Sequence, residues 1–313
     1  MSHWSVMGEG VAGLCVATLL AERGEKLEVI TSEHLPASHW AGGMLAPFCE
    51  GESAPEQVTE WGQRSAAWWA SRVEGVEHRG TLVVAPPRDA QELTRFARLT
   101  REHQWVEPVA IEPALSGRFA RGLFFAAEAH LDPRKAMEQL RSRLEVKGVP
   151  FHRGKPTGKV LDCRGIHANQ DLTELRAVRG EMVLLHSNEL SLSRPVRLLH
   201  PRFPCYLVPR SGGHFMLGAT MVESNDASPI SARAMMELLS AAWAIHPALG
   251  EARIIESGTG RRPAFRHNVP EIRYRDGIFY LNGLYRHGFL LAPVMAEQLM
   301  KQLSQELPYE NRT

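Results

Sequence analysis

The sequence is poor in cysteine, in net charge and in long apolar runs. Its four cysteines are scattered without a CxxC pair or a His/Cys cluster at metal spacing, so we expect free thiols in a reducing cytoplasm and no metal site. Lys+Arg 36 against Asp+Glu 35 gives +1, which argues against nucleic acid or an anionic membrane as partner. No stretch reaches about eighteen apolar residues, and the N-terminus lacks the pattern of a signal peptide, so no membrane span is predicted.

What the sequence does contain begins with a glycine motif near the N-terminus. Gly8, Gly10 and Gly13 follow a short strand and open an alanine- and leucine-rich helix, and Leu27–Ile30 has the pattern of a second strand. In a dinucleotide fold the first glycine makes a tight turn, the second admits a pyrophosphate, and the third allows close helix packing. The alternative is a tight glycine turn in another α/β fold.

A second motif lies near the other end of the chain, at residues 282–293. It places Arg286 beside a glycine turn that opens an apolar helix running to about Gln302. A helix start offers free N–H groups and partial positive charge, which suits an anion, and arginine can hold a carboxylate through two hydrogen bonds. Taken alone, the stretch could also be an ordinary strand–turn–helix with a surface arginine.

Between these motifs the pattern alternates between helices and strands without repeats or low-complexity segments. We expect strands at Arg79–Pro86, Lys159–Asp162, Glu181–Leu185, Cys205–Pro209, His214–Leu217 and Gly277–Leu281. Between Glu256 and the strand at Gly277–Leu281 we expect turns. Helices are expected at Gln57–Arg72, Asp89–His103, Pro133–Val146 and Ser231–Ala244, with Asp132 capping the third. This order predicts two interleaved domains.

Four further segments occur in an order that points to a family. They are Trp40–Pro47, Cys205–Arg210 with Gly218–Met221, Gly260–Pro263, and Arg286–Pro293. Together with the glycine motif, they resemble the D-amino-acid oxidase superfamily of FAD-dependent enzymes, and most closely the glycine oxidases of thiamine biosynthesis. The resemblance implies an α/β protein in which a Rossmann-like FAD-binding domain of the glutathione-reductase type (1–78, 130–176 and 258–313) is interleaved with a mixed or antiparallel-sheet α+β substrate-binding domain (79–129 and 177–257).

The resemblance also implies roles for individual residues. Arg262 would bind the substrate carboxylate with help from Tyr206, Met221 would limit the space near the α-carbon, and Arg286 would sit beside the pocket. The residues expected near FAD are Gly8, Gly10, Val11, Ala12, Gly13, Glu33, Ala41, Gly42, Gly43, Met44, Gly260, His287, Gly288, Phe289, Leu290 and Leu291. Hydride transfer to flavin needs an oriented substrate and no dedicated acid–base residue, so we expect none.

Simpler interpretations exist for several of these residues. Arg262 could be a solvated member of the Arg261–Arg262 pair, and Tyr206 could be a core aromatic. Met221 could serve only packing, and His287 could support its turn.

The sequence also departs from the family. Glu33 comes after the end of the second strand instead of at it, the region 148–160 is short, His267 replaces an acidic residue, and Pro204 stands where some relatives have a polar one.

The leading hypothesis is oxidation of a small amino acid, glycine first, with O2 as the expected electron acceptor. A D-amino-acid or N-methyl-glycine (sarcosine-type) oxidase or dehydrogenase is the runner-up. A flavin-carrying or flavin-free subunit without turnover, and a nicotinamide-dependent dehydrogenase, are the alternatives from other classes. The sequence leaves open whether the chain forms a homo-oligomer.

Overall fold

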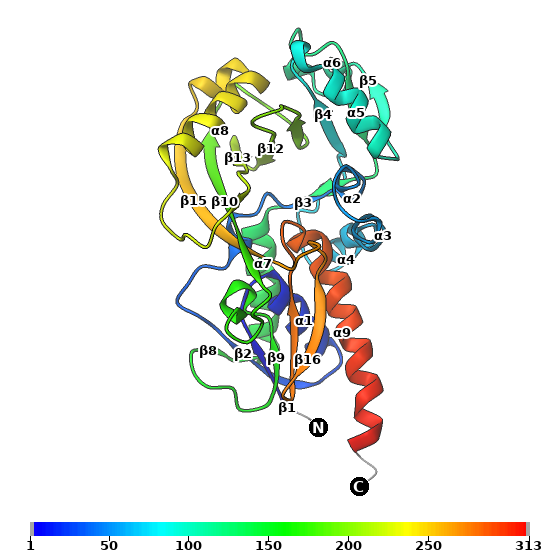
Figure 1. The fold of residues 1–313 in the computed structure, drawn as a ribbon, viewed down its shortest axis with the longest axis vertical. Helices are drawn as coiled ribbons and strands as arrows, with labels where there is room; N and C mark the ends of the chain where they lie inside the picture. The colour runs from blue at the N-terminus through cyan, green and yellow to red at the C-terminus, as the bar shows by residue number, and fades with distance from the viewer. Residues whose placement is uncertain (1–2, 311–313) are drawn as a thin grey trace.

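The computed structural model describes residues 3–310 and the side chains of residues 3–305. Two β-sheets, each with its own helices, stand one above the other in the orientation of Figure 1. The lower sheet takes its strands from residues 3–30, 151–162 and 271–282, and the upper sheet takes its strands from residues 81–125, 176–223 and 253–264. The chain therefore interleaves the two parts, as the sequence predicts.

The lower sheet has six strands in the order β16-β17-β9-β1-β2-β8. They are β1 (His3–Met7), β2 (Lys26–Ile30), β8 (Phe151–His152), β9 (Lys159–Asp162), β16 (Glu271–Arg275) and β17 (Ile278–Asn282). Neighbouring strands are parallel except for β16 and β17. The carboxyl ends of the parallel strands meet at one edge, where α/β proteins bind their ligands.

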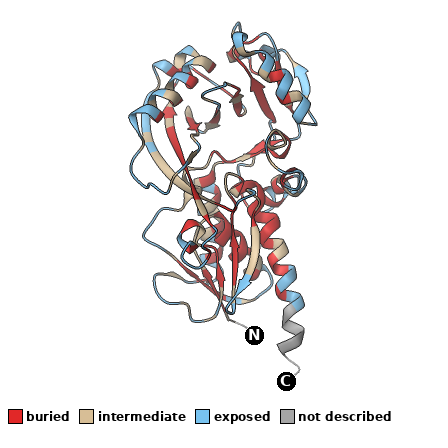
Figure 2. Cartoon of the chain, in the orientation of Figure 1, coloured by how far each residue is buried: buried red, intermediate tan, exposed pale blue. Residues whose placement is uncertain are grey.

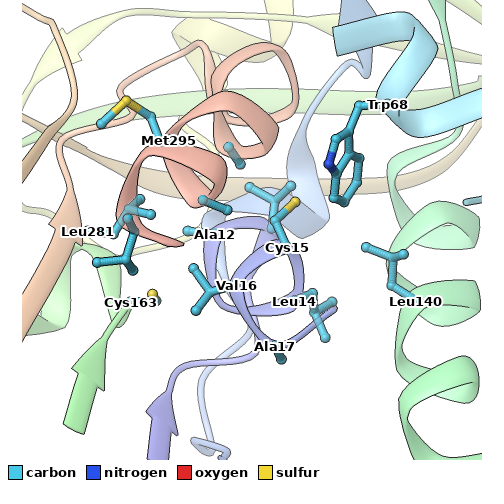
Figure 3. Close-up of a cluster of buried hydrophobic side chains, with 14 of the residues drawn as sticks. Ala12, Leu14, Cys15, Val16, Ala17, Trp68, Leu140, Cys163, Leu281 and Met295 are labelled. Atoms are coloured by element: carbon cyan, nitrogen blue, oxygen red, sulfur yellow. The ribbon is translucent and has the colours of Figure 1, made fainter. Parts of the chain in front are cut away.

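Three helices cover this sheet: α1 (Val11–Glu22), α7 (Pro133–Val146) and α9 (Gly288–Glu310). α1 packs against both of the others, and Figure 3 shows Val16 of α1 within a cluster that includes Leu140 of α7 and Met295 of α9. The predicted cap of α7 is confirmed, because Asp132 Oδ1 accepts a hydrogen bond from the backbone N–H of Arg134 at 3.0 Å. Burial of these apolar faces fixes where α1 and α9 begin.

The upper sheet is mixed and mostly antiparallel. Its strands are β4 (Thr81–Val84), β5 (Gln104–Val106), β6 (Gly122–Phe125), β10 (Arg176–His186), β11 (Val196–Leu198), β12 (Cys205–Arg210), β13 (His214–Gly218), β14 (Val222–Glu223) and β15 (Arg253–Ala264). Its helices are α5 (Gln91–Leu99), α6 (Pro108–Ile111) and α8 (Ala232–Ile245). The 3-10 helices of the chain are η1 (Ala37–Trp40), η2 (Pro87–Asp89), η3 (Pro113–Leu115), η4 (Gly165–Ala168) and η5 (Pro247–Gly250).

Two structures connect the sheets. A small ladder pairs β3 (Met44–Leu45) with β7 (Ala129–His130), and α2 (Pro47–Glu50), α3 (Glu56–Gly62) and α4 (Ser65–Ala70) follow β3. The second is the ribbon that β10 and β15 form, paired from Arg176↔Ala264 to His186↔Arg253. Figure 1 shows this ribbon rising from the lower part into the upper sheet. Residues of the ribbon thus face both parts of the molecule.

The structure corrects two predicted elements. The single helix expected at Gln57–Arg72 is two, α3 and α4, because Ser65 Oγ and Trp69 Nε1 of α4 donate hydrogen bonds to the carbonyl of Phe289 at 3.0 and 2.8 Å. The turns expected after Glu256 are the strand β15, which pairs with β10 along its length despite its glycines. Residue 258, where the last cofactor-binding segment was expected to begin, therefore lies inside the ribbon.

Figure 2 shows the buried residues concentrated along both sheets and on the inner faces of their helices. All four cysteines are buried and free, as predicted. Trp68 and Trp69 lie in the core. No helix within residues 3–310 has the length and hydropathy needed to cross a membrane. In the same range, no three His, Cys, Asp or Glu residues are grouped to hold a metal ion.

Candidate active site

The glycine motif forms the turn between β1 and α1. Gly8 has φ +104°, and a Cβ atom there would lie 2.7 Å from the carbonyl oxygen of Cys163. A Cβ atom on Gly13 would collide with the carbonyl of Gly8, so both positions need glycine to bring the strand and the helix together. The N–H of Val11, the first of α1, donates to Ser38 Oγ at 3.1 Å. The start of α1 thus contacts the segment that follows β2.

The start of α9 lies beside the start of α1. A Cβ atom on Gly288 would be 3.3 Å from Cγ1 of Val11. The first α-helical hydrogen bond of α9 runs from the N–H of Leu291 to the carbonyl of His287, so the N–H groups at residues 288–290 lack an acceptor one turn back in the helix. Two helix N-termini therefore direct positive partial charge to one place, where an anionic group is favoured.

The segment from Ala41 to Met44 lies between this place and the upper sheet. Gly43 has φ +74°, and a Cβ atom there would collide with the carbonyl of Leu131. Arg210 Nη2 donates to the carbonyl of Gly42 at 2.7 Å, which fixes that peptide. A Cβ atom on Gly42 would lie 2.5 Å from Cε2 of Tyr206, so the loop and the tyrosine ring are in close contact. Gly42 is one of the residues predicted near FAD, and Tyr206 is one of those predicted at the substrate carboxylate.

Two glycines of β15 pack against η1, which follows β2. Trp40 packs onto Gly258 so closely that a Cβ atom there would collide with its ring, and Ala37 lies 3.4 Å from the Cβ position of Gly260. Glu33, expected near the adenosine ribose, is exposed and bonds to Arg153 Nη1 at 2.8 Å. Its role at the ribose stays a prediction.

Arg262 is half-buried at the base of the β10–β15 ribbon. Its Nη1 donates to the carbonyl of Thr220 at 3.1 Å, and its guanidinium lies flat against Gly180, where any Cβ atom would collide with it. Among the described residues no carboxylate lies within ion-pair distance of it. Burial lowers the pKa of Arg262, as expected for a cation that has lost water without gaining a counter-ion.

Tyr206 lies beside this arginine and extends from β12. Its hydroxyl is 3.6 Å from Sδ of Met182, a weak acceptor. Burial raises the pKa of Tyr206, so the phenol stays protonated and is free to donate to a stronger acceptor. Arg262 and Tyr206 together offer a guanidinium and a hydroxyl to the same small anion. The structure therefore brings these two predicted residues together.

Arg286, in contrast, already holds a carboxylate. Its Nη2 and Nε lie 2.7 and 2.9 Å from Oε2 of Glu50, and Nη2 also donates to Ser53 Oγ at 2.7 Å. His287 Nε2 lies 3.0 Å from the same Glu50 oxygen. Because a carboxylate only accepts, this ring nitrogen must carry the proton. Glu50 was not predicted, since an acidic residue in the segment Cys49–Glu52 gives no periodic or motif signal.

Met221 and Tyr285 separate the two arginines. Tyr285 Oη and Arg286 Nη1 lie 3.4 and 3.6 Å from Sδ of Met221, which is half-exposed. Outside them is a cavity of about 430 Å³, which we call the vestibule. Its lining includes Glu52, Arg197, Met221, Tyr285 and Arg286, whereas Arg262 and Tyr206 are not part of it. The vestibule thus lies beside Met221 and Arg286 and does not contain the Arg262–Tyr206 pair.

The residues present fit the cofactor that the resemblance implies. FAD has an anionic diphosphate and a ring whose N1–C2 edge gains negative charge on reduction. The adjoining starts of α1 and α9 offer N–H groups to such anions, and the glycines at 8 and 13 keep side chains out of the turn. The residues near these helix starts would hold the cofactor, with Arg262 and Tyr206 beyond the loop at Gly42.

Comparison with known proteins agrees with this arrangement. Residues 3–302 match the family model described as FAD dependent oxidoreductase. The chain is 50% identical to a protein of Rhizobium etli named as a candidate thiamine biosynthesis oxidoreductase ThiO, with 96% of each chain covered. It is 33% identical to a glycine oxidase of Geobacillus kaustophilus, covering 93% of this chain and 89% of the relative.

Among solved structures, glycine oxidase from Bacillus cereus superposes with a TM-score of 0.80 at 22% identity, covering 95% of this chain and 96% of the other. At that identity, the likeness shows a common fold. The family match over nearly the whole chain and the relatives at 50% and 33% identity show the family. The protein belongs to the family of FAD-dependent oxidoreductases.

Proposed function

We propose that this FAD-dependent oxidoreductase oxidises glycine to its imine, which serves thiazole assembly in thiamine biosynthesis. The observation that carries the proposal is Arg262, a half-buried cation with a protonated tyrosine beside it and no carboxylate partner among the described residues. The names of the relatives at 50% and 33% identity support the substrate and the pathway. We also propose that the lower part of the molecule is the FAD-binding domain and the upper part the substrate-binding domain.

The proposed reaction removes a hydride from the α-carbon and a proton from nitrogen, so that the carbon–nitrogen single bond of glycine becomes the double bond of the imine. FAD, when bound, supplies the two-electron acceptor for that hydride. Arg262 holds the carboxylate through hydrogen bonds to its guanidinium, and Tyr206 donates to the same group. Fixing one end of so small a molecule limits the directions in which its C–H bonds can point. Orientation of this kind can supply much of the rate enhancement without an acid–base residue.

The remaining charged groups near the site do not offer a base. Oε2 of Glu50 is occupied by Arg286 and by His287. The substrate amine must therefore arrive neutral or lose its proton to water. We expect the rate of flavin reduction to rise with pH through the ionisation of the amine. The ionisation of the substrate amine alone is enough to produce this pH dependence of flavin reduction.

The test is the visible spectrum of the purified, yellow protein, recorded without oxygen before and after glycine is added. Loss of the oxidised flavin bands would support the proposal. Bands that persist with glycine but disappear with N-methyl-glycine or a D-amino acid would replace glycine with that amine. Bands that persist with all three would contradict an amino-acid oxidase and favour a subunit without turnover.

A further inference from the structure

The vestibule outside the Arg262–Tyr206 pair contains three arginines, and every one of them is paired. Arg286 lies 2.7 Å from Glu50, Arg197 lies 2.7 Å from Glu52, and Arg95 lies 2.6 Å from Glu52. Arg95 also bonds to Glu92 at 3.0 Å. The walls of the vestibule are thus balanced in charge. Each lining arginine has a carboxylate partner among the described residues, in contrast to Arg262.

Glu50 is the most constrained of these carboxylates. It is at the end of α2, and the preceding residue is held by a hydrogen bond of 2.7 Å from the N–H of Cys49 to Oε1 of Glu128. Burial alone would raise the pKa of Glu50, but the charges of Arg286 and His287 lower it well below its usual range. The carboxylate is therefore ionised at neutral pH, and it neutralises Arg286.

The two arginines are near enough for one substrate to meet both. Arg262 bonds to the carbonyl of Thr220, and Arg286 contacts the side chain of the next residue, Met221. The charge of Arg286 also contributes to lowering the pKa of Arg262, although burial is the larger cause. Without Glu50, a second cation would therefore stand at the mouth of the carboxylate pocket.

We propose that Glu50 sets the substrate specificity by holding Arg286, so that the pocket accepts one carboxylate and rejects a second acidic group. Arg262 binds the α-carboxylate, and the far end of the substrate faces Met221, Tyr285 and Arg286, whose charge is neutralised by Glu50. A neutral extension fits this environment, whereas an acidic one finds Arg286 occupied and the negative charge of Glu50 close by. The inference rests on the proposed function, because it takes Arg262 as the carboxylate anchor.

The first test measures binding of unreactive acids to the FAD-loaded protein through the change that they cause in the flavin spectrum. Butyrate and succinate share a four-carbon skeleton and differ in one carboxylate. In wild type, butyrate should bind more tightly. In Glu50→Gln, the affinity ratio of succinate to butyrate should rise roughly ten- to hundredfold, the range expected for a hydrogen bond to a charged partner. An unchanged ratio would overturn the proposal.

Two controls separate specificity from a loosened fold. In the double variant Glu50→Gln/Arg286→Gln no guanidinium is released, so the ratio should return to within about threefold of wild type, a change below the value of one such bond. Glu92→Gln removes a carboxylate from the vestibule wall, but Arg95 still has its ion pair with Glu52. No guanidinium is released, so this variant should leave the ratio unchanged. If Glu92→Gln also raised the ratio, a general loss of negative charge would explain the data; if the double variant kept the raised ratio, release of Arg286 would not be the cause. Either result would overturn the role of Glu50.

The second test uses flavin reduction with a matched pair of substrates, N-ethylglycine and iminodiacetate. Each contains the glycine unit, and iminodiacetate adds a second carboxylate. Glu50→Gln should raise kcat/KM for iminodiacetate relative to N-ethylglycine by the same factor as in the binding test. Failure of wild type to oxidise any amine would contradict the proposed function, whereas the butyrate–succinate ratio would still decide the role of Glu50. The two ideas can thus fail separately.

Discussion

A buried acid behind the candidate site predicts how stability should depend on pH. Glu128 is fully buried at the junction of the two parts, where Oε1 accepts the N–H of Cys49 at 2.7 Å and Oε2 has no partner among the described residues. Burial raises the pKa of Glu128 from 4.5 to about 7. The folded protein therefore keeps a proton that the unfolded chain releases near its ordinary pKa.

The sign and size of the effect follow from this difference. Below pH 4.5 both states are protonated and the group costs nothing. As pH rises toward 7 the unfolded state gains by ionising while the folded state does not, so the free energy of unfolding falls. A difference of about 2.5 between the two pKa values corresponds to roughly 3 kcal/mol, and most of it, roughly 2–3 kcal/mol, appears between pH 5 and pH 8.

Replacing Glu128 with glutamine should remove this dependence while keeping an oxygen for the N–H of Cys49. We expect Glu128→Gln to match wild type within about 1 kcal/mol at pH 5 and to be more stable than wild type at pH 8 by roughly 2–3 kcal/mol. Urea unfolding of both proteins at several pH values, followed by tryptophan fluorescence, measures the difference. A difference between variant and wild type that is the same at pH 5 and pH 8 would refute the reasoning.

Three further predictions concern the site. Arg262→Met should lower kcat/KM for glycine roughly thirtyfold or more while FAD stays bound, since losing one partner of a buried charge pair costs about 2–5 kcal/mol; steady-state kinetics equal to wild type would show that another group binds the carboxylate. Gly180→Ala places a methyl group in the space of that guanidinium, so it should raise KM for glycine and lower kcat/KM, as Arg262→Met does. An unaltered KM would mean that Arg262 does not bind the substrate carboxylate. Gly10→Val should abolish FAD retention, because its side chain would occupy the place where the second glycine of the motif admits the pyrophosphate, so a variant purified fully yellow would contradict the placement of the diphosphate.

The sequence predicted the features that depend on local rules. The turn at Gly8 needs a positive φ, and the cap of α7 needs an acidic residue followed by proline, so both can be predicted from a few neighbouring residues. The resemblance to a family added the order of distant segments. It predicted that Arg262 and Tyr206 serve one carboxylate, which no local pattern could have done, and the structure places the two side chains near each other.

The features that were missed depend on contacts between distant residues. The break between α3 and α4 follows from two hydrogen bonds to Phe289, more than 200 residues away. Gly258 weakens the strand pattern of β15, yet glycine is required there because Trp40 packs onto it. Glu50 joins the candidate site only because Arg286 and His287 reach it from the turn before α9. Such partners have no signature in the sequence around each residue.

The long pairing of β10 with β15 separates the proposed anchor from the parts that shape its entrance. Arg262 is opposite Val178 at the end of the ribbon next to η4, whereas residues 187–195 lead from β10 to β11 and residues 246–252 lead from α8 to β15. Insertions or deletions in these connections would leave the register of the ribbon unchanged. A lineage of such enzymes could therefore exchange one amine for another by varying loop length, while the group that recognises an amino acid keeps its place.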